Sequence, residues 1–263
     1  MSGVDGEDRE TELGDKMSLL DHLTELRQRL LYSVIALVVC FFGCFFFASE
    51  IFNFLVAPLA DIWADQPNRR LIFTALHEKF FTEIKVAFFA AACVAFPVIA
   101  SQIWMFIAPG LYKNEKAAFL PFLLATPVLF TAGAASVYYG VMPVAWQFFA
   151  GFEQLGTDGQ LAIELEPKVN EYLSLVMQLI FAFGLAFQLP VLLTLLARVG
   201  IIDCAWLKSK RRYAIVFAFI AAAVLTPPDP LSQVGLAVPI ILLYEVSIWI
   251  AAMFERNQAK AAA

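Results

Sequence analysis

Charged residues are scarce in this sequence of 263 residues. Only 16% of the residues are charged, 61% are hydrophobic, and the mean hydropathy is +0.74. Soluble domains are nearer half apolar and a quarter charged. The 26 phenylalanines stand in long uncharged blocks, which a lipid environment selects because hydrocarbon offers no partners to polar groups. The composition therefore predicts an all-α integral membrane protein with one membrane domain.

The motifs of nucleotide, metal and covalent catalytic sites are also missing. The sequence has no GxxxxGK(S/T) phosphate loop, no HExxH and no GxSxG nucleophile elbow. Its four cysteines form no CxxC pair, so neither a disulfide nor a zinc site is indicated. The two histidines, His22 and His77, are predicted below to lie on opposite sides of the membrane. We therefore predict no enzyme, no catalytic residues, no metal site and no cofactor.

The beginning of the chain lacks an apolar run and contains many of the acidic residues. A cleaved signal peptide starts with basic residues and soon turns apolar, and a transit peptide is poor in acids. Residues 1–17 fit neither pattern, so we expect a disordered acidic tail there. The first apolar block is then a retained transmembrane span.

Six uncharged blocks predict six transmembrane helices, since about 20 apolar residues cross the ~30 Å hydrocarbon core. The predicted spans are about 30–49, 86–108, 118–140, 172–197, 213–225 and 231–254. They form one membrane domain over 18–254, followed by a tail at 255–263. Spans 5 and 6 are predicted to be short. The apolar stretch of span 5 has 13 residues, roughly 20 Å of helix, so either the bilayer thins there or flanking residues extend the helix.

Lysine and arginine are unevenly divided between the two sides of this arrangement. Thirteen lie in the N-terminal tail, the 109–117 and 198–212 loops and the C-terminal tail, and five lie in or beside the two long loops at 50–84 and 141–171. Cytoplasmic segments are the ones enriched in these residues, so both termini are predicted to be cytoplasmic. The outward segment 50–66 mixes apolar residues with acids and predicts an interfacial amphipathic helix, broken near Pro58.

Two cytoplasmic segments carry polar patterns. Leucines at three- and four-residue spacing over 18–30 predict an amphipathic helix on which Glu25 and Arg29 share a face. An ordinary interfacial helix with ion pairs explains that pattern too, and composition alone favours it. In the loop between spans 2 and 3, a Pro-Gly pair predicts a tight reversal. Glu115 follows at the start of span 3, where a carboxylate suits a helix N-terminus without any further function.

Two polar residues are predicted inside the spans, roughly 15 Å from the cytoplasmic boundary. They are Gln188 in span 4 and Glu245 in span 6. An ionisable group at such depth is a functional candidate. The alternatives are a hydrogen bond between helices for Gln188, and a protonated or paired acid that holds helices together for Glu245. The sequence leaves both alternatives open.

Several segments, taken in order, resemble the TatC family of the twin-arginine protein translocase. They are HLTELRQRLL before span 1, FLVAPL after it, FFTEIKVAF before span 2, PVIASQIWMFIAPGLYKNE between spans 2 and 3, FAFGLAFQLPV in span 4, KSKRRYAIV before span 5 and LTPPDPLSQ before span 6. Each segment alone is weak, but their order and spacing are specific. The resemblance covers nearly the whole chain apart from the acidic N-terminal extension and the C-terminal tail.

The resemblance implies a receptor for signal peptides of folded export substrates, which carry two adjacent arginines. The family's signal-peptide positions fall here on Glu25, Leu26, Arg27, Phe106, Tyr112 and Glu115. Guanidinium groups pair with carboxylates through two parallel hydrogen bonds, which lysine does not reproduce. Two outward positions that are functional in the family match Pro58 and Asp229.

The partners and location are also implied by the resemblance. They are the single-span subunits TatA and TatB, several copies of the chain per complex, and the lipid of the bacterial cytoplasmic (inner) membrane, with no nucleic acid. Transport would be driven by the proton gradient, which agrees with the missing nucleotide motif.

One position departs from the family pattern. Many family members carry glutamate in span 4, at a position associated with partner transmembrane helices, where this chain has Gln188. Glutamine does not titrate, so Glu245 becomes the acid of greater interest. A proton-coupled secondary transporter using these two residues is the alternative function, although no internal repeat supports it. A structural scaffold is a more distant alternative.

Overall fold

The structure, a computed structural model, describes residues 19–64, 69–107, 120–154, 161, 163–198, 200–226 and 230–262. These residues fold into helices, with two isolated β-bridges that join Ile72 to Lys168 and Gln154 to Ile163. The helices are α2 (Leu19–Phe46), α3 (Ala48–Ile62), α4 (Glu78–Ile107), α5 (Leu120–Ser136), the π-helical η3 (Val137–Val141), α6 (Met142–Ala150), α7 (Val169–Ala186), α8 (Leu189–Arg198), α9 (Cys204–Ser209), α10 (Arg211–Leu225) and α11 (Pro230–Ala262). The expected tail at 1–17, the reversal after span 2, and Tyr112, Glu115 and Asp229 lie outside the described residues.

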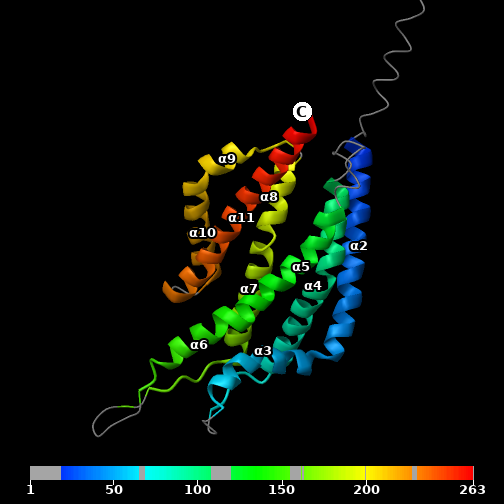
Figure 1. The fold of residues 1–263 in the computed structure, drawn as a ribbon. Coiled ribbons are helices and arrows are strands. Elements are labelled where there is room, and N and C mark those ends of the chain that lie inside the picture. Colours follow the sequence, from blue (N-terminus) through cyan, green and yellow to red (C-terminus); the bar gives the residue numbers. More distant parts are fainter. Residues whose placement is uncertain are drawn as a thin grey trace, which may run out of the picture.

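The long helices run between two ends of the molecule (Figure 1). The start of α2, the short helix α9 and the end of α11 lie at one end, here called the α9 end. Helix α3 and the described segments that precede α4 and α7 lie at the other, here called the α3 end. Helix α2 packs on α4, α5 on α7, and α11 on both α8 and α10. Both ends of the described chain therefore lie at the α9 end, as the predicted topology requires.

Five stretches of the described chain are long and apolar enough to cross a membrane. They are His22–Phe46, Glu78–Phe106, Pro121–Ala150, Val169–Arg198 and Ser232–Arg256. Helix α10, predicted as span 5, has only 15 residues, roughly 22 Å of helix. Five spans are thus supported by length, and the sixth stays a prediction.

The prediction that span 6 is short is wrong. Helix α11 has 33 residues and is the longest of the described helices. Pro239 stands inside it without ending it. The helix also continues into the predicted tail at 255–263, because alanine, lysine, arginine and glutamine are strong helix formers.

Predicted span 4 is divided into two helices. Helix α7 ends at Ala186 and α8 begins at Leu189. Pro190 explains the break, because proline has no N–H and its ring excludes the carbonyl four residues earlier, which is that of Ala186. Gln188 therefore lies in the turn between two helices, not within a regular span.

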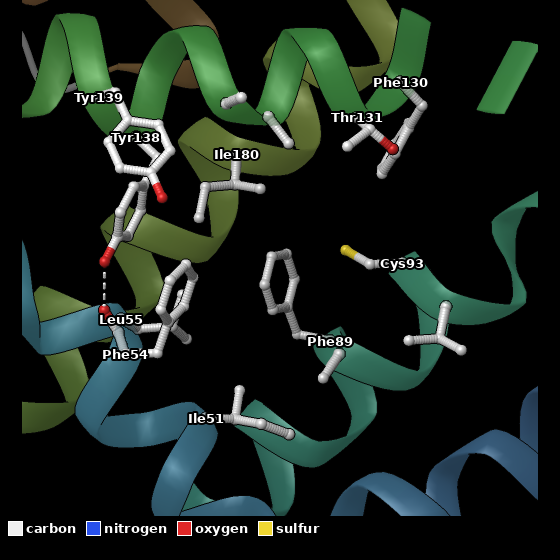
Figure 2. Close-up of a pocket in the computed structure, with 14 residues that line it drawn as sticks. Ile51, Phe54, Leu55, Phe89, Cys93, Phe130, Thr131, Tyr138, Tyr139 and Ile180 are labelled. Atoms are coloured by element: carbon white, nitrogen blue, oxygen red, sulfur yellow. Dashed lines mark hydrogen bonds between the residues drawn. The ribbon is translucent and has the colours of Figure 1, made fainter. Parts of the chain in front are cut away.

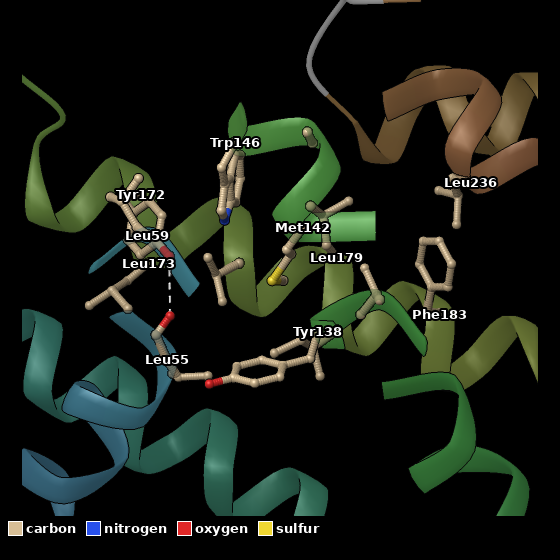
Figure 3. Packing of buried hydrophobic residues seen from close by; sticks show 14 of the residues in the cluster. Leu55, Leu59, Tyr138, Met142, Trp146, Tyr172, Leu173, Leu179, Phe183 and Leu236 are labelled. Carbon is tan, nitrogen blue, oxygen red and sulfur yellow. Dashed lines mark hydrogen bonds between the residues drawn. The ribbon is translucent and has the colours of Figure 1, made fainter. Parts of the chain in front are cut away.

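The predicted break of the outward helix at Pro58 is also wrong, since α3 continues through this residue to Ile62. Proline leaves the carbonyl of Phe54 without its helical donor. The hydroxyl of Tyr138 donates to that oxygen at 2.6 Å (Figure 2), and the hydroxyl of Tyr172 donates to the next carbonyl, of Leu55, at 3.2 Å (Figure 3). Pro58 itself is buried. Two tyrosines from distant helices thus satisfy the backbone around the proline.

The main core lies where α3, η3, α6, α7 and α11 meet (Figure 3). Phe183, Met142, Leu173 and Leu236 are at most 1% exposed there. Leu236 of α11 packs in the same cluster as Phe183 of α7. This cluster therefore joins the C-terminal helix to the centre of the molecule.

Helices α5 and α7 approach closely through two glycines. A Cβ atom added at Gly133 would lie 2.6 Å from the carbonyl oxygen of Phe183, and one added at Gly184 would lie 2.5 Å from Cε2 of Phe130. Small residues at such contacts let membrane helices pack backbone to backbone. The glycines therefore set the distance between α5 and α7.

The change Gly133→Ala is expected to lower the free energy of unfolding by about 1–3 kcal/mol, the usual range for overpacking. The obstructing atom belongs to the backbone, so α5 and α7 have to separate. Thermal unfolding of the detergent-purified chain measures the effect. Gly43→Ala is the matched control, because a Cβ there has nothing within 4 Å. Equal shifts for both variants contradict this role of Gly133.

The α3 end is closed by polar contacts between its loops. Arg69 forms an ion pair with Glu153, whose second carboxylate oxygen accepts the backbone N–H of Leu165 at 3.1 Å. Glu78, at the start of α4, accepts the N–H of Thr74 at 2.8 Å and that of Asn170 at 3.4 Å. These carboxylates connect the segments before α4 and α7, which are far apart in sequence.

Candidate functional site

The start of α2 meets the end of α4 at the α9 end of the molecule. The guanidinium of Arg29 lies 3.1 Å from a carboxylate oxygen of Glu25. The same guanidinium donates to Oε1 of Gln102 at 3.3 Å and contacts Sδ of Met105 at 3.5 Å. The Glu25 side chain is 19% exposed and that of Arg29 28%. A partly shielded carboxylate thus holds a guanidinium between two helices.

Apolar and basic side chains lie next to the pair of Glu25 and Arg29. His22 stacks on Phe106 with ring centroids 4.4 Å apart, which is a second contact between α2 and α4. Leu26 is 43% exposed and Arg27 is also exposed. The structure therefore brings Glu25, Leu26 and Arg27 of α2 together with Phe106 of α4 at one end.

One further member of this cluster was indicated by the sequence, and another was missed. Arg29 is spaced four residues from Glu25, so their pairing was visible in the helical period. Gln102 lies 73 residues from Arg29 in sequence, and no local signal indicates it.

The amide of Gln188 connects three helices at the break between α7 and α8. Its Nε2 donates to the carbonyl of Thr126 in α5 at 3.0 Å and to that of Gly184 in α7 at 3.4 Å. Its Oε1 is buried and has no hydrogen-bond partner in the part of the chain that the structure describes. Gln188 therefore stabilises the helix contact while one acceptor stays unsatisfied.

Glu245 is paired with a residue of a neighbouring helix, which is one of the alternatives that the sequence left open. Its carboxylate pairs with Arg211, at the start of α10, at 2.7 Å. The two side chains are 44% and 48% exposed. Glu245 is therefore a paired acid near the basic start of α10, and its partner differs from those of Gln188.

The described residues contain no group of three His, Cys, Asp or Glu side chains that could hold a metal ion. The chemistry of the α9 end is therefore that of charged and amide side chains beside exposed apolar ones. Such a surface can bind a cationic peptide with an apolar segment.

Comparison with known proteins identifies the family of the chain. A model of the family "Sec-independent protein translocase protein (TatC)" matches residues 21–239. The chain belongs to the TatC family. The family of the chain is thus the one that its sequence segments resembled, and that prediction is confirmed.

The family match extends over nearly the full chain. The TatC protein of Magnetococcus marinus is 51% identical over 249 residues, which cover 95% of this chain and 89% of that protein. The TatC protein of Rickettsia prowazekii is 45% identical over 238 residues, covering 90% and 94%. A crystal structure of a twin-arginine translocase receptor, TatC, superposes with a TM-score of 0.75 at 40% identity, covering 88% of this chain and 98% of that one.

These comparisons make the chain a membrane component of a Sec-independent protein translocase. The alternative of a secondary transporter loses its basis. Its two residues, Gln188 and Glu245, each have other partners.

Proposed function

We propose that the chain is the receptor subunit of a twin-arginine translocase and is not an enzyme. It binds signal peptides with two adjacent arginines on the surface that contains Glu25, Leu26, Arg27 and Phe106, together with Tyr112 and Glu115 of the neighbouring loop. This surface faces the cytoplasm, with both termini on that side and α10 as a short sixth span of the bacterial inner membrane.

The ion pair of Glu25 with Arg29 is the observation that carries this proposal. It places a guanidinium 3.1 Å from a carboxylate that is only 19% exposed. Charge-assisted hydrogen bonds are stronger than neutral ones, and partial burial strengthens them further. The pair therefore provides an example, within the chain itself, of how Glu25 holds an arginine side chain.

An incoming arginine has two ways to reach this carboxylate. It shares Glu25 with Arg29, or it replaces Arg29, whose guanidinium keeps its bond to Gln102. Glu115 supplies the second carboxylate for the second arginine of the signal. The planar guanidinium fits each carboxylate through two hydrogen bonds, whereas the ammonium of lysine is a point charge.

The apolar part of a signal peptide has a matching surface on α2. Leu23, Leu26 and Leu30 are 59%, 43% and 61% exposed. They recur at three- and four-residue spacing, so they lie along one side of the helix. This stripe continues from the Glu25 site in the direction of the membrane span.

Single-span TatA and TatB subunits are proposed to dock beside Gln188. From Thr126, whose carbonyl accepts a hydrogen bond from Gln188, α5 continues to Phe130, and η3 follows with Tyr138. These two rings line an apolar groove of about 430 Å³ between α3, α4, α5 and α7 (Figure 2). Ala90 and Ala134 in its lining leave space for a close helix contact.

The change Gln188→Leu is expected to reduce recovery of the single-span subunits about threefold, because hydrogen bonds between membrane helices contribute about 0.6 kcal/mol. The unsatisfied Oε1 is buried, so the partly exposed side chain has to turn toward the partner helix before it accepts a hydrogen bond from a polar residue there. Co-purification from detergent extracts measures the effect. Ser247→Ala, which removes a hydroxyl of α11 that bonds its own backbone and lies outside this groove, is the control. Unchanged recovery with Gln188→Leu contradicts this docking site.

Export in living cells tests the whole proposal. A strain that lacks its own TatC subunit is expected to export a folded twin-arginine reporter when it expresses this chain. Loss of export with the joint changes Glu25→Ala and Glu115→Ala, at unchanged protein level, supports the receptor role. Full export by that double variant contradicts it and favours a scaffold.

A further inference from the structure

A second concave surface lies on the opposite side of the membrane domain from α2, between α8, α10 and α11. Its volume is about 520 Å³, and Leu193, Ala214, Phe217, Ile220 and Ile240 are among its apolar lining residues. Lys210 lines the same groove at the start of α10. The groove is thus apolar along its length and basic at the α9 end.

The basic end carries three cations that have no carboxylate partner among the described residues. Within the described chain, Lys208, Lys210 and Arg212 form no ion pair.

The nearby acids are already engaged. Glu245 pairs with Arg211 at 2.7 Å, Glu255 accepts the backbone N–H of Cys204 at 2.6 Å, and Asp203 caps α9 by accepting the N–H of Trp206. The four basic residues of segment 208–212 outnumber these three acids, so the end of the groove keeps a net positive charge.

Two aromatic rings that line the groove lie close to the ammonium group of Lys210. The ammonium of Lys210 lies 5.8 Å from the ring of Trp206 and 5.3 Å from that of Tyr213, and both rings also line the groove. The hydroxyl of Tyr244 donates to the carbonyl of Leu207 at 2.8 Å and so fixes α9 to α11. Tryptophan, tyrosine and lysine in this arrangement are typical of the level of lipid headgroups.

The length of the groove indicates which kind of ligand fits it. From Lys210 to Ile220, both of which line it, α10 rises roughly 15 Å at 1.5 Å per residue. This equals about half of the ~30 Å hydrocarbon core, the depth of one leaflet. A partner helix that crosses the membrane needs twice this length, whereas an acyl chain of one leaflet fits it.

We propose that this groove binds an anionic phospholipid, with an acyl chain along α10 and the phosphate beside Lys208, Lys210 and Arg212. The site is separate from the proposed signal-peptide surface on α2 and α4. It attaches the short helix α10 to lipid of the leaflet at the α9 end.

Native mass spectrometry of the detergent-purified full chain tests the proposal, with phosphatidylglycerol and phosphatidylcholine as probes. The unmodified chain is expected to bind phosphatidylglycerol more tightly than phosphatidylcholine. The joint changes Lys210→Gln and Arg212→Gln are expected to weaken its binding about 25-fold, since each basic residue at a membrane surface contributes about fivefold. The joint changes Arg70→Gln and Lys79→Gln, which remove two exposed cations near the α3 end, serve as the control and are expected to have no effect.

The groove itself is tested without changing charge. The change Ala214→Phe fills the groove and is expected to weaken phosphatidylglycerol binding, while soluble glycerol phosphate does not compete on the unmodified chain. Equal binding of the two lipids, or equal losses in the two double variants, overturns the proposal. Competition by glycerol phosphate together with normal lipid binding by Ala214→Phe overturns it in favour of a free-phosphate site.

Discussion

The change Glu25→Ala is expected to lower the affinity for a twin-arginine signal peptide about ten- to a hundredfold. A hydrogen bond to a charged group contributes about 1.5–3 kcal/mol. The loss has a second cause, because Arg29 then keeps its charge without the carboxylate 3.1 Å away and repels an incoming arginine. Site-specific photo-crosslinking of a labelled peptide to the chain in membranes measures the affinity.

Two further variants separate charge from shape. Glu25→Gln keeps the size of the side chain and removes its charge, so it is also expected to lower the affinity for the signal peptide. Glu166→Ala removes a carboxylate at the α3 end, where its partner Arg70 lies 3.6 Å away and both side chains are well exposed, and it is expected to leave binding unchanged. Peptide binding by Glu25→Ala at the level of the unmodified chain contradicts the proposed role of this residue.

The change Arg69→Gln is expected to destabilise the α3 end by about 3 kcal/mol, the scale found when one partner of a buried ion pair is removed. The side chains of Arg69 and Glu153 are only 16% and 17% exposed. Glu153 also accepts the N–H of Leu165, so its unpaired charge disturbs the segment before α7. Thermal unfolding of the detergent-purified chain measures the loss.

The adjacent arginine is a matched control. Arg70 pairs with Glu166 at 3.6 Å, with side chains 74% and 46% exposed, and surface pairs of this kind contribute about 0–1 kcal/mol. Arg70→Gln is therefore expected to have little effect. The double change Arg69→Gln and Glu153→Gln is expected to recover part of the stability, because no charge is then left unpaired. Equal destabilisation by the two arginine changes is incompatible with this account of the α3 end.

The membrane helices were largely predictable from the sequence, because a bilayer requires long uncharged blocks. The effect of each proline was not. Pro190 divides a predicted span, whereas α3 continues through Pro58. The outcome at Pro58 depends on Tyr138 and Tyr172, whose bonds to α3 cross 84 and 117 residues of sequence. Helical periodicity and local propensity do not predict hydrogen-bond donors that lie so far away in the sequence.

The site was predictable to the extent that its residues are neighbours in the chain. The helical period placed Glu25 and Arg29 on one face, and the structure pairs them. For Glu245 the sequence left open whether the acid is paired, and the structure pairs it with Arg211. Its partner Arg211 lies 34 residues away on another helix, which counting along one helix does not reveal.

The central claim is that carboxylates at the α9 end recognise the guanidinium groups of a signal peptide. The most direct measurement compares two peptides, identical except that one carries two arginines and the other two lysines, for crosslinking to the unmodified chain in membranes. The account predicts that the arginine peptide binds at least about tenfold more tightly, since lysine does not form the paired hydrogen bonds with a carboxylate. Equal binding of the two peptides would contradict it.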